Sequence, residues 1–286
     1  MDGYASVGSA LILSGMKVTL NARPPKAIIA DTGVLKNAPK EMIQAGYGDI
    51  IGKYSCLNDW KLSALINDEY FCQEIYDLTY SQVEKVRCLA KDVLARSDEA
   101  IKLLMEALVL VGIAMSYVGN SRPASGSEHH LSHFFEITGI LDKKEYYPHG
   151  IDVMYSAAET AKIREKIINS FPKLHKFDKD MWVKEIKRIY SASALEVIAL
   201  QDKLGWYGVC DEEVVLTKWD EIKEVLKEAP TFPDMVAILT EIDLSYDEFV
   251  KFYTREKIDD AVIYAKDLKD RYTVLWLNYR YFNVEK

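Results

Sequence analysis

The chain has 286 residues, of which 49% are hydrophobic and 28% are charged, and its formal net charge is −8. This composition is typical of a folded protein with a substantial core and excludes a disordered chain. The negative charge argues against nucleic acid as a partner, because phosphate backbones bind basic surfaces.

Cysteine spacing and the length of the apolar runs bear on the cellular compartment of the protein. The four cysteines are scattered without a CxxC pair, which favours a reducing compartment over a disulfide framework. The longest apolar stretch, Ala107–Ala114, is too short to cross a bilayer. No basic segment precedes the apolar run Ser9–Leu13, so we expect no signal peptide. We therefore expect a soluble, cytoplasmic protein without a membrane span, for which a homo-oligomer is one allowed state.

The N-terminal residues differ in pattern from the rest of the chain. Tyr4–Leu13 fits a helix closed by Gly15, whereas Lys17–Leu20 and Ala27–Ala30 are short β-prone runs separated by Pro24-Pro25. Two short strands need further strands to pair with, and nothing later in the sequence supplies them. We therefore predict that residues 1–38 are the end of a larger α/β domain.

From Pro39 onward the apolar periodicity is helical almost throughout. Pro39 suits a first helical turn, and Ser97 and Ser245 are candidate N-caps. The sequence predicts an all-α domain over residues 39–286, with helices over Asp49–Asn67, Glu69–Asp77, Ser81–Ala95, Glu99–Val118, Ser127–Thr138, Gly150–Ser170, Asp180–Ser191, Ala194–Leu204, Thr217–Lys227, Thr231–Ile238, Tyr246–Thr254, Lys257–Asp267 and a short segment after Arg271.

Three of the five histidines lie close together in the sequence. On a helix, His129 and His133 are one turn apart on the same face, and His130 points about a quarter-turn away. Such a pair can give a metal one ligand and leave the other for a substrate, or it can give both ligands. A polar helix face that is merely rich in histidine explains the pattern equally well.

Two further positions favour a metal site. Asp49 follows Gly46 and Gly48 at the predicted start of an apolar helix, where it is either an ordinary N-cap or a carboxylate displayed at a tight turn. His149 lies between Pro148 and Gly150 at another helix start, where an isolated surface histidine is the simpler explanation. Together with His129, these residues would form a triad with open positions for substrate.

The loop before the histidine helix, Arg122–Ser127, could bind an anion at the helix N-terminus, although a lone Gly/Ser loop is weak evidence. The sequence contains neither a GxGxxG motif nor a P-loop.

The segments that contain Asp49, the histidines and the loop Arg122–Ser127 resemble the sn-glycerol-1-phosphate dehydrogenases. These enzymes are a branch of the iron-containing alcohol dehydrogenase and dehydroquinate synthase-like superfamily. The resemblance covers the first half of the chain, and Ser121–His133 is its most specific part. The other stretches that carry it are Met1–Ser6, Ala27–Asp31, Ala45–Tyr54, Asp59-Trp60 and Pro148–Gly150.

The resemblance implies a mainly α fold, the helical C-terminal domain of the dehydroquinate synthase-like fold, with residues 1–38 as a remnant of the nucleotide-binding domain. It implies NAD- or NADP-dependent reduction of dihydroxyacetone phosphate to sn-glycerol 1-phosphate, a reaction of phospholipid metabolism, at a zinc or nickel ion. The residues concerned are Asp49, His129 and His149 for the metal, Asp49 and His133 for catalysis, Asp2, Asp49 and His133 for substrate, and Ser6 for the nicotinamide cofactor.

The chain departs from the family at its start. In the family, a nucleotide-binding domain with a glycine-rich turn precedes the motif that begins here at Met1. We therefore expect an incomplete enzyme whose activity alone is in doubt. The alternatives are a glycerol dehydrogenase-like enzyme of the same superfamily, or an inactive metal-binding remnant that serves as a binding or assembly domain.

Overall fold

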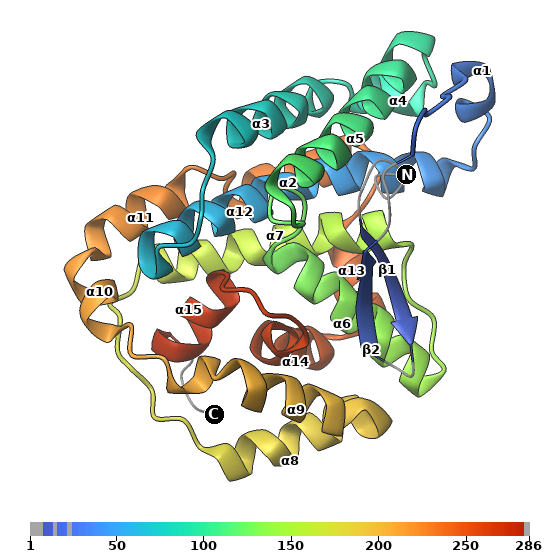
Figure 1. Ribbon diagram of the computed structural model, residues 1–286. Helices are drawn as coiled ribbons and strands as arrows, with labels where there is room; N and C mark the ends of the chain where they lie inside the picture. Colours follow the sequence, from blue (N-terminus) through green and yellow to red (C-terminus); the bar gives the residue numbers. More distant parts are fainter. Residues whose placement is uncertain (1–7, 14–15, 22–24, 283–286) are drawn as a thin grey trace.

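The computed structural model describes residues 8–13, 16–21 and 25–282 and is mainly helical, as the sequence predicts (Figure 1). The longer helices are α2 (Lys40–Asn67), α3 (Gln73–Arg87), α5 (Asp98–Val118), α6 (Ser127–Asp142), α7 (His149–Ile168), α8 (Lys179–Tyr190) and α9 (Ala194–Leu204). The shorter ones are α1 (Thr32–Leu35), α4 (Ala90–Leu94), α10 (Glu212–Thr217), α11 (Trp219–Lys227), α12 (Phe232–Glu241), α13 (Tyr246–Tyr253), α14 (Arg255–Tyr264) and α15 (Val274–Tyr281), with 3-10 turns at Ser191–Ser193, Trp206–Gly208 and Ala265–Leu268.

Two strands form an antiparallel hairpin near the N-terminus. They are β1 (Gly8–Leu13) and β2 (Met16–Asn21), and β2 lies against α6 (Figure 1). The predicted strand Lys17–Leu20 is confirmed as part of β2, whereas the predicted helix is wrong over residues 8–13, because this apolar run has a partner strand close by. The predicted strand Ala27–Ala30 is also wrong: no strand of the described residues pairs with it, and most of it is exposed. The division of domains at residue 38 stays a prediction.

Most helices match their predicted positions, and the main discrepancies lie in the first third of the chain. Helix α9 has the predicted bounds, and α5 begins after Ser97, whose side chain accepts a hydrogen bond from the backbone N–H of Ala100. The two helices predicted over residues 69–95 are instead one long helix, α3, followed by the short α4. Helices α1 and α10 were not predicted.

Helix α2 begins at Lys40, so the predicted start at Asp49 is wrong. Gly46 and Gly48 lie inside this helix rather than at a turn, and the reason is a close crossing with α7. A Cβ atom on Gly48 would lie 2.4 Å from the carbonyl oxygen of Gly150, and one on Gly150 would lie 1.9 Å from that of Ala45. Only glycine permits this approach, which brings the middle of α2 to the first turn of α7.

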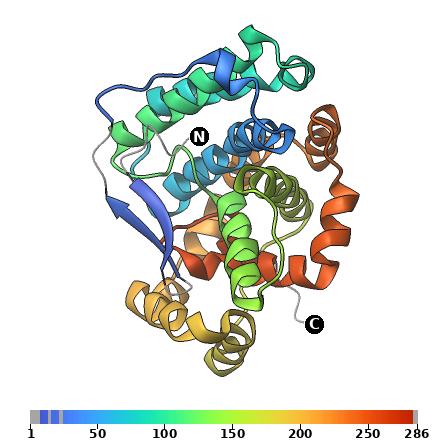
Figure 2. The same cartoon turned by 90° about the vertical axis from the view of Figure 1, so that its right-hand side faces the viewer.

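Helices α2, α6 and α7 form the centre of the molecule, and the remaining helices surround them (Figures 1 and 2). Helices α2 and α7 cross, and α6 packs against both of them. All three helices are largely buried, including many of their polar residues.

Within the described part of the chain, only α5 is long and apolar enough to cross a membrane. Half of its apolar window is buried inside the fold, and core helices of water-soluble proteins pass the same test. Helix α5 packs against α2 and α3, as a core helix does.

Candidate metal centre

The crossing of α2, α6 and α7 brings together the three residues that the sequence proposes as metal ligands. Asp49 comes from the middle of α2, His129 from the first turn of α6, and His149 from the first residue of α7. Each offers one ligand atom, and these atoms all lie within 4.8 Å of one another. Asp49 and His129 are buried, whereas His149 is exposed, so the group is open on one side.

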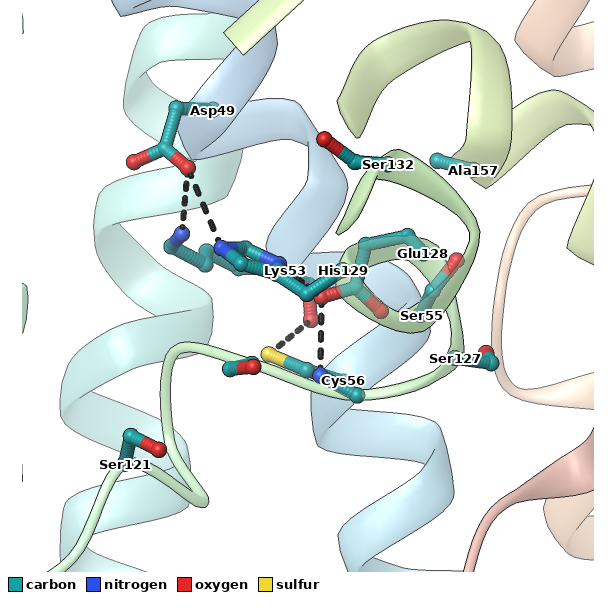
Figure 3. Close-up of polar contacts among 12 residues, drawn as sticks. Asp49, Lys53, Ser55, Cys56, Ser121, Ser127, Glu128, His129, Ser132 and Ala157 are labelled. Carbon is teal, nitrogen blue, oxygen red and sulfur yellow. Dashed lines mark hydrogen bonds and ion pairs between the residues drawn. The ribbon is translucent and has the colours of Figure 1, made fainter. Parts of the chain in front are cut away.

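Lys53 adds a positive charge to this group. It follows Asp49 by one turn on α2, and its Nζ donates a hydrogen bond to Oδ1 of Asp49 at 3.0 Å (Figure 3). The same carboxylate oxygen lies 3.5 Å from Nε2 of His129. The Lys53 side chain is fully buried, and burying an ammonium is unfavourable unless it is paired with an opposite charge.

Glu128 lies on the other side of the His129 ring. Its Oε1 is 2.6 Å from Nδ1 of His129 and accepts a hydrogen bond from the backbone N–H of Gly126 at 2.9 Å (Figure 3). Burial, and after it the neighbouring carboxylate of Asp59, raise the pKa of Glu128 to about 7. The imidazole of His129 therefore lies between two buried carboxylates, one at each ring nitrogen.

The loop Arg122–Ser127 does not offer an open anion site. Asp59 accepts a hydrogen bond from the backbone N–H of Ser127 at 2.6 Å, and Glu128 occupies that of Gly126. The first amides of α6 thus already bind carboxylates of the chain itself. Arg122 is buried and pairs with Glu69, so the interpretation of this loop as an anion-binding loop is wrong.

The remaining site histidines lie next to the triad. The ring centroid of His133 is 5.9 Å from that of His129 and 5.1 Å from that of His149. Ser132 lies between the two helices, with its Oγ 3.2 Å from Nδ1 of His149. His130 is also buried, but it belongs to neither of the ligand groups found among the described residues.

A second group shares His149 with the first. It consists of His133, Glu136 and His149, whose ligand atoms also lie within 4.8 Å of one another. The sequence proposed His133 as a substrate contact rather than a ligand, so the two groups are alternatives to be separated by experiment. Asp2 and Ser6, proposed for substrate and cofactor, lie outside the described residues.

The first group has the chemistry that a divalent transition metal needs. One carboxylate and two imidazoles, with a side open to water or substrate, is the donor set of a catalytic rather than a structural site. The buried carboxylate of Asp49 pairs with the buried ammonium of Lys53, so a positive charge already lies beside this carboxylate inside the protein. The residues present therefore fit the metal that the family resemblance implies.

Lys53, Glu128 and Ser132 are the site residues that sequence reasoning missed. Lys53 could have been found from its spacing, because it follows Asp49 by one turn in an otherwise apolar stretch. Glu128 and Ser132 were hidden by their neighbours, since both lie within the histidine-rich segment itself.

Comparison with known proteins shows which enzymes the chain resembles. Residues 1–39 match the family described as iron-containing alcohol dehydrogenase. The chain is 42% identical over 153 residues to a glycerol-1-phosphate dehydrogenase (NAD(P)+) of Geobacillus stearothermophilus, covering 54% of this chain and 38% of that protein. Over about half of its length, the chain is thus similar to a protein named glycerol-1-phosphate dehydrogenase.

Two further relatives with the same name show how far the likeness extends. The glycerol-1-phosphate dehydrogenase of Bacillus licheniformis is 38% identical over 170 residues, covering 59% of this chain and 42% of that protein. The one from Pyrococcus furiosus is 38% identical over 142 residues, covering 50% and 40%. The chain thus spans only about two fifths of the length of these relatives.

Proposed function

We propose that this chain is the metal- and substrate-binding part of an NAD(P)-dependent glycerol-1-phosphate dehydrogenase. The observation that carries the proposal is the convergence of Asp49, His129 and His149 from three helices onto one open-sided position. Relatives named for this activity support it, since their similarity to the chain is far above chance. The substrate would be dihydroxyacetone phosphate, and residues 1–38 would belong with the nucleotide-binding domain.

In this function Asp49, His129 and His149 hold the metal, which would act as a Lewis acid toward the carbonyl group of the substrate. The ring of His133, one turn after His129, stacks on that of the exposed ligand His149, and from there it would orient the substrate or exchange a proton with its oxygen. Lys53 neutralises the carboxylate of Asp49, and Glu128 contacts Nδ1 of His129. Hydride transfer belongs to the nicotinamide cofactor, for which Ser6 is the proposed contact and Asp2 the proposed contact for substrate.

The donor set is compatible with zinc or nickel, and we propose one of these as the natural metal. We also propose a cytoplasmic location, because four cysteines without a CxxC pair fit a reducing compartment.

The test is a set of three measurements on the purified chain loaded with zinc or nickel. We expect submillimolar binding of NADH or NADPH, oxidation of the bound cofactor by dihydroxyacetone phosphate, and much weaker oxidation by unphosphorylated dihydroxyacetone. A preference for the unphosphorylated ketone would instead indicate a glycerol dehydrogenase-like enzyme. Metal binding without nicotinamide binding would contradict the enzyme and favour a binding domain.

A further inference from the structure

We propose that Glu128 is a positioning residue that fixes the tautomer and ring orientation of His129, so that Nε2 of His129 is the atom presented to the metal. This inference rests on the metal centre proposed above and adds to it a residue that binds neither metal nor substrate. It is argued from the contacts of the Glu128 carboxylate rather than from the resemblance to the dehydrogenases.

The contact that carries the inference is the short one between Glu128 and His129. Oε1 of Glu128 lies 2.6 Å from Nδ1 of His129, and both residues are buried in the first turn of α6 (Figure 3). Across the ring, Nε2 of His129 faces Oδ1 of Asp49 at 3.5 Å. The two ring nitrogens therefore face different partners: Nδ1 faces Glu128, and Nε2 faces the ligand group.

A neutral imidazole carries one proton and has one lone pair available for a metal. An ionised carboxylate accepts hydrogen bonds and cannot donate them, so Glu128 favours the tautomer in which Nδ1 is protonated. The lone pair then remains on Nε2, on the side of Asp49 and His149. In other metal sites, carboxylates that bind the second ring nitrogen of a histidine ligand strengthen metal binding in this way.

Glu128 is itself held in place by the backbone around it. Its Oε1 also accepts the N–H of Gly126, and a Cβ atom on Gly126 would lie 2.6 Å from both Oδ2 of Asp59 and Cα of Cys56. Asp59 in turn accepts hydrogen bonds from the backbone N–H groups of Ser127 and Val274, at 2.6 and 2.7 Å. The hydrogen bond from the Gly126 N–H therefore helps to hold the Glu128 carboxylate beside His129.

The other oxygen of Glu128 argues against a purely structural role. Within the described residues, Oε2 is buried and has no hydrogen-bond partner. A buried carboxylate oxygen without a partner is destabilising, and a neutral side chain at this position would remove that cost. A glutamate here is thus unfavourable for folding and is explained by its bond to the histidine.

The site contains a natural control in a second pair of the same type. Oε2 of Glu136 lies 3.3 Å from Nδ1 of His133, one turn along α6, and the Glu136 side chain is 29% exposed. If His133 is not a metal ligand, removing the charge of Glu136 should leave metal affinity nearly unchanged. If the second group, with His133, Glu136 and His149, holds the metal, the order of the two effects reverses.

The experiment measures zinc affinity by competition with a chelator for the wild-type chain, Glu128→Gln and Glu136→Gln. Gln preserves shape and one acceptor oxygen but removes the charge, so we expect Glu128→Gln to weaken zinc binding by about 10- to 100-fold. Glu136→Gln compares the two ligand groups: weaker zinc binding by this variant than by Glu128→Gln would place the metal in the second group and would overturn the inference. Circular dichroism of the metal-free proteins shows whether each variant is folded.

A second measurement needs no substitution. In the metal-free wild-type chain at mildly alkaline pH, nitrogen-15 NMR of the histidine rings should show His129 protonated at Nδ1. Protonation at Nε2, or zinc affinity in folded Glu128→Gln equal to that of the wild type, would overturn the inference. Failure of the proposed metal centre would give a different result, because the wild-type chain itself would then bind no zinc.

Discussion

Gly150 at the start of α7 packs directly on the backbone of Ala45 in α2, and a Cβ atom on Gly150 would lie 1.9 Å from the Ala45 carbonyl oxygen. This contact sets the distance between the two helices that carry Asp49 and His149. The metal group therefore depends on a glycine that contributes no ligand.

Replacement of that glycine should damage both the fold and the site. Gly150→Ala places a methyl group against backbone atoms that cannot rotate away, so we expect a loss of about 1–3 kcal/mol or more in unfolding free energy. It should also weaken zinc binding, because His149 is the preceding residue. Gly208→Ala is the control, since nothing lies within 4 Å of a Cβ at Gly208. Urea unfolding of both variants measures the difference, and equal stabilities would contradict the close packing.

The histidine variants separate the two overlapping ligand groups. His149→Ala should remove most of the bound metal while the helical circular dichroism is retained, because His149 belongs to both groups and is exposed. His133→Ala should keep the metal and weaken substrate binding, whereas Asp49→Asn should lose metal. Metal content after dialysis measures all three. The opposite order, with metal lost from His133→Ala and retained in Asp49→Asn, would place the ion in the second group.

The sequence predicted which side chains come together better than it predicted how they are held. Helical periodicity and the resemblance were sufficient to propose Asp49, His129 and His149 on helices or at helix starts. Gly48 was interpreted as part of a turn because its actual neighbour, Gly150, lies far away in the sequence and becomes visible only when α2 and α7 cross.

Charged residues next to the ligands were missed for a related reason. A sequence does not show whether a lysine is exposed or fully buried, and Lys53 is favourable inside the protein only because Asp49 is beside it. Similarly, the bond between Glu128 and His129 depends on the backbone turn at Gly126, which periodicity alone does not predict.

Lys53 should matter most when the metal is absent. In Lys53→Met the buried carboxylate of Asp49 loses a buried cation, and breaking such a pair destabilises proteins by about 3–5 kcal/mol. Zinc would supply positive charge to the same carboxylate, so the rise in Tm on adding zinc should be larger for Lys53→Met than for the wild type. Thermal unfolding with and without zinc measures both effects.

A surface lysine provides the comparison for this variant. Lys61 pairs with Glu228 at 2.7 Å where both side chains are partly exposed, so Lys61→Met should change stability by no more than about 1 kcal/mol. An unchanged Tm for metal-free Lys53→Met would show that Asp49 does not depend on the ammonium group.

A buried carboxylate on α7 gives a prediction for pH. Asp152 is fully buried, and both of its oxygens lie 2.9 Å from the hydroxyl of Tyr253. Burial raises the pKa of Asp152 well above its usual value of 3.8. At pH values between 3.8 and the raised pKa, the folded chain retains a proton at Asp152 that the unfolded chain releases. Stability from this group is therefore fully present at acidic pH and is lost as pH rises toward the raised pKa.

Asp152→Asn removes this titration and keeps an oxygen that can accept the Tyr253 hydroxyl. Relative to the wild type, the variant should therefore gain unfolding free energy progressively as pH rises above about 3.8. Tyr253→Phe should have the opposite trend, because it removes the hydrogen-bond donor that favours the ionised carboxylate. Urea unfolding across the acidic to neutral range measures both variants. If the difference between Asp152→Asn and the wild type is the same at every pH, Asp152 titrates alike in the folded and unfolded chains, and burial does not control its charge.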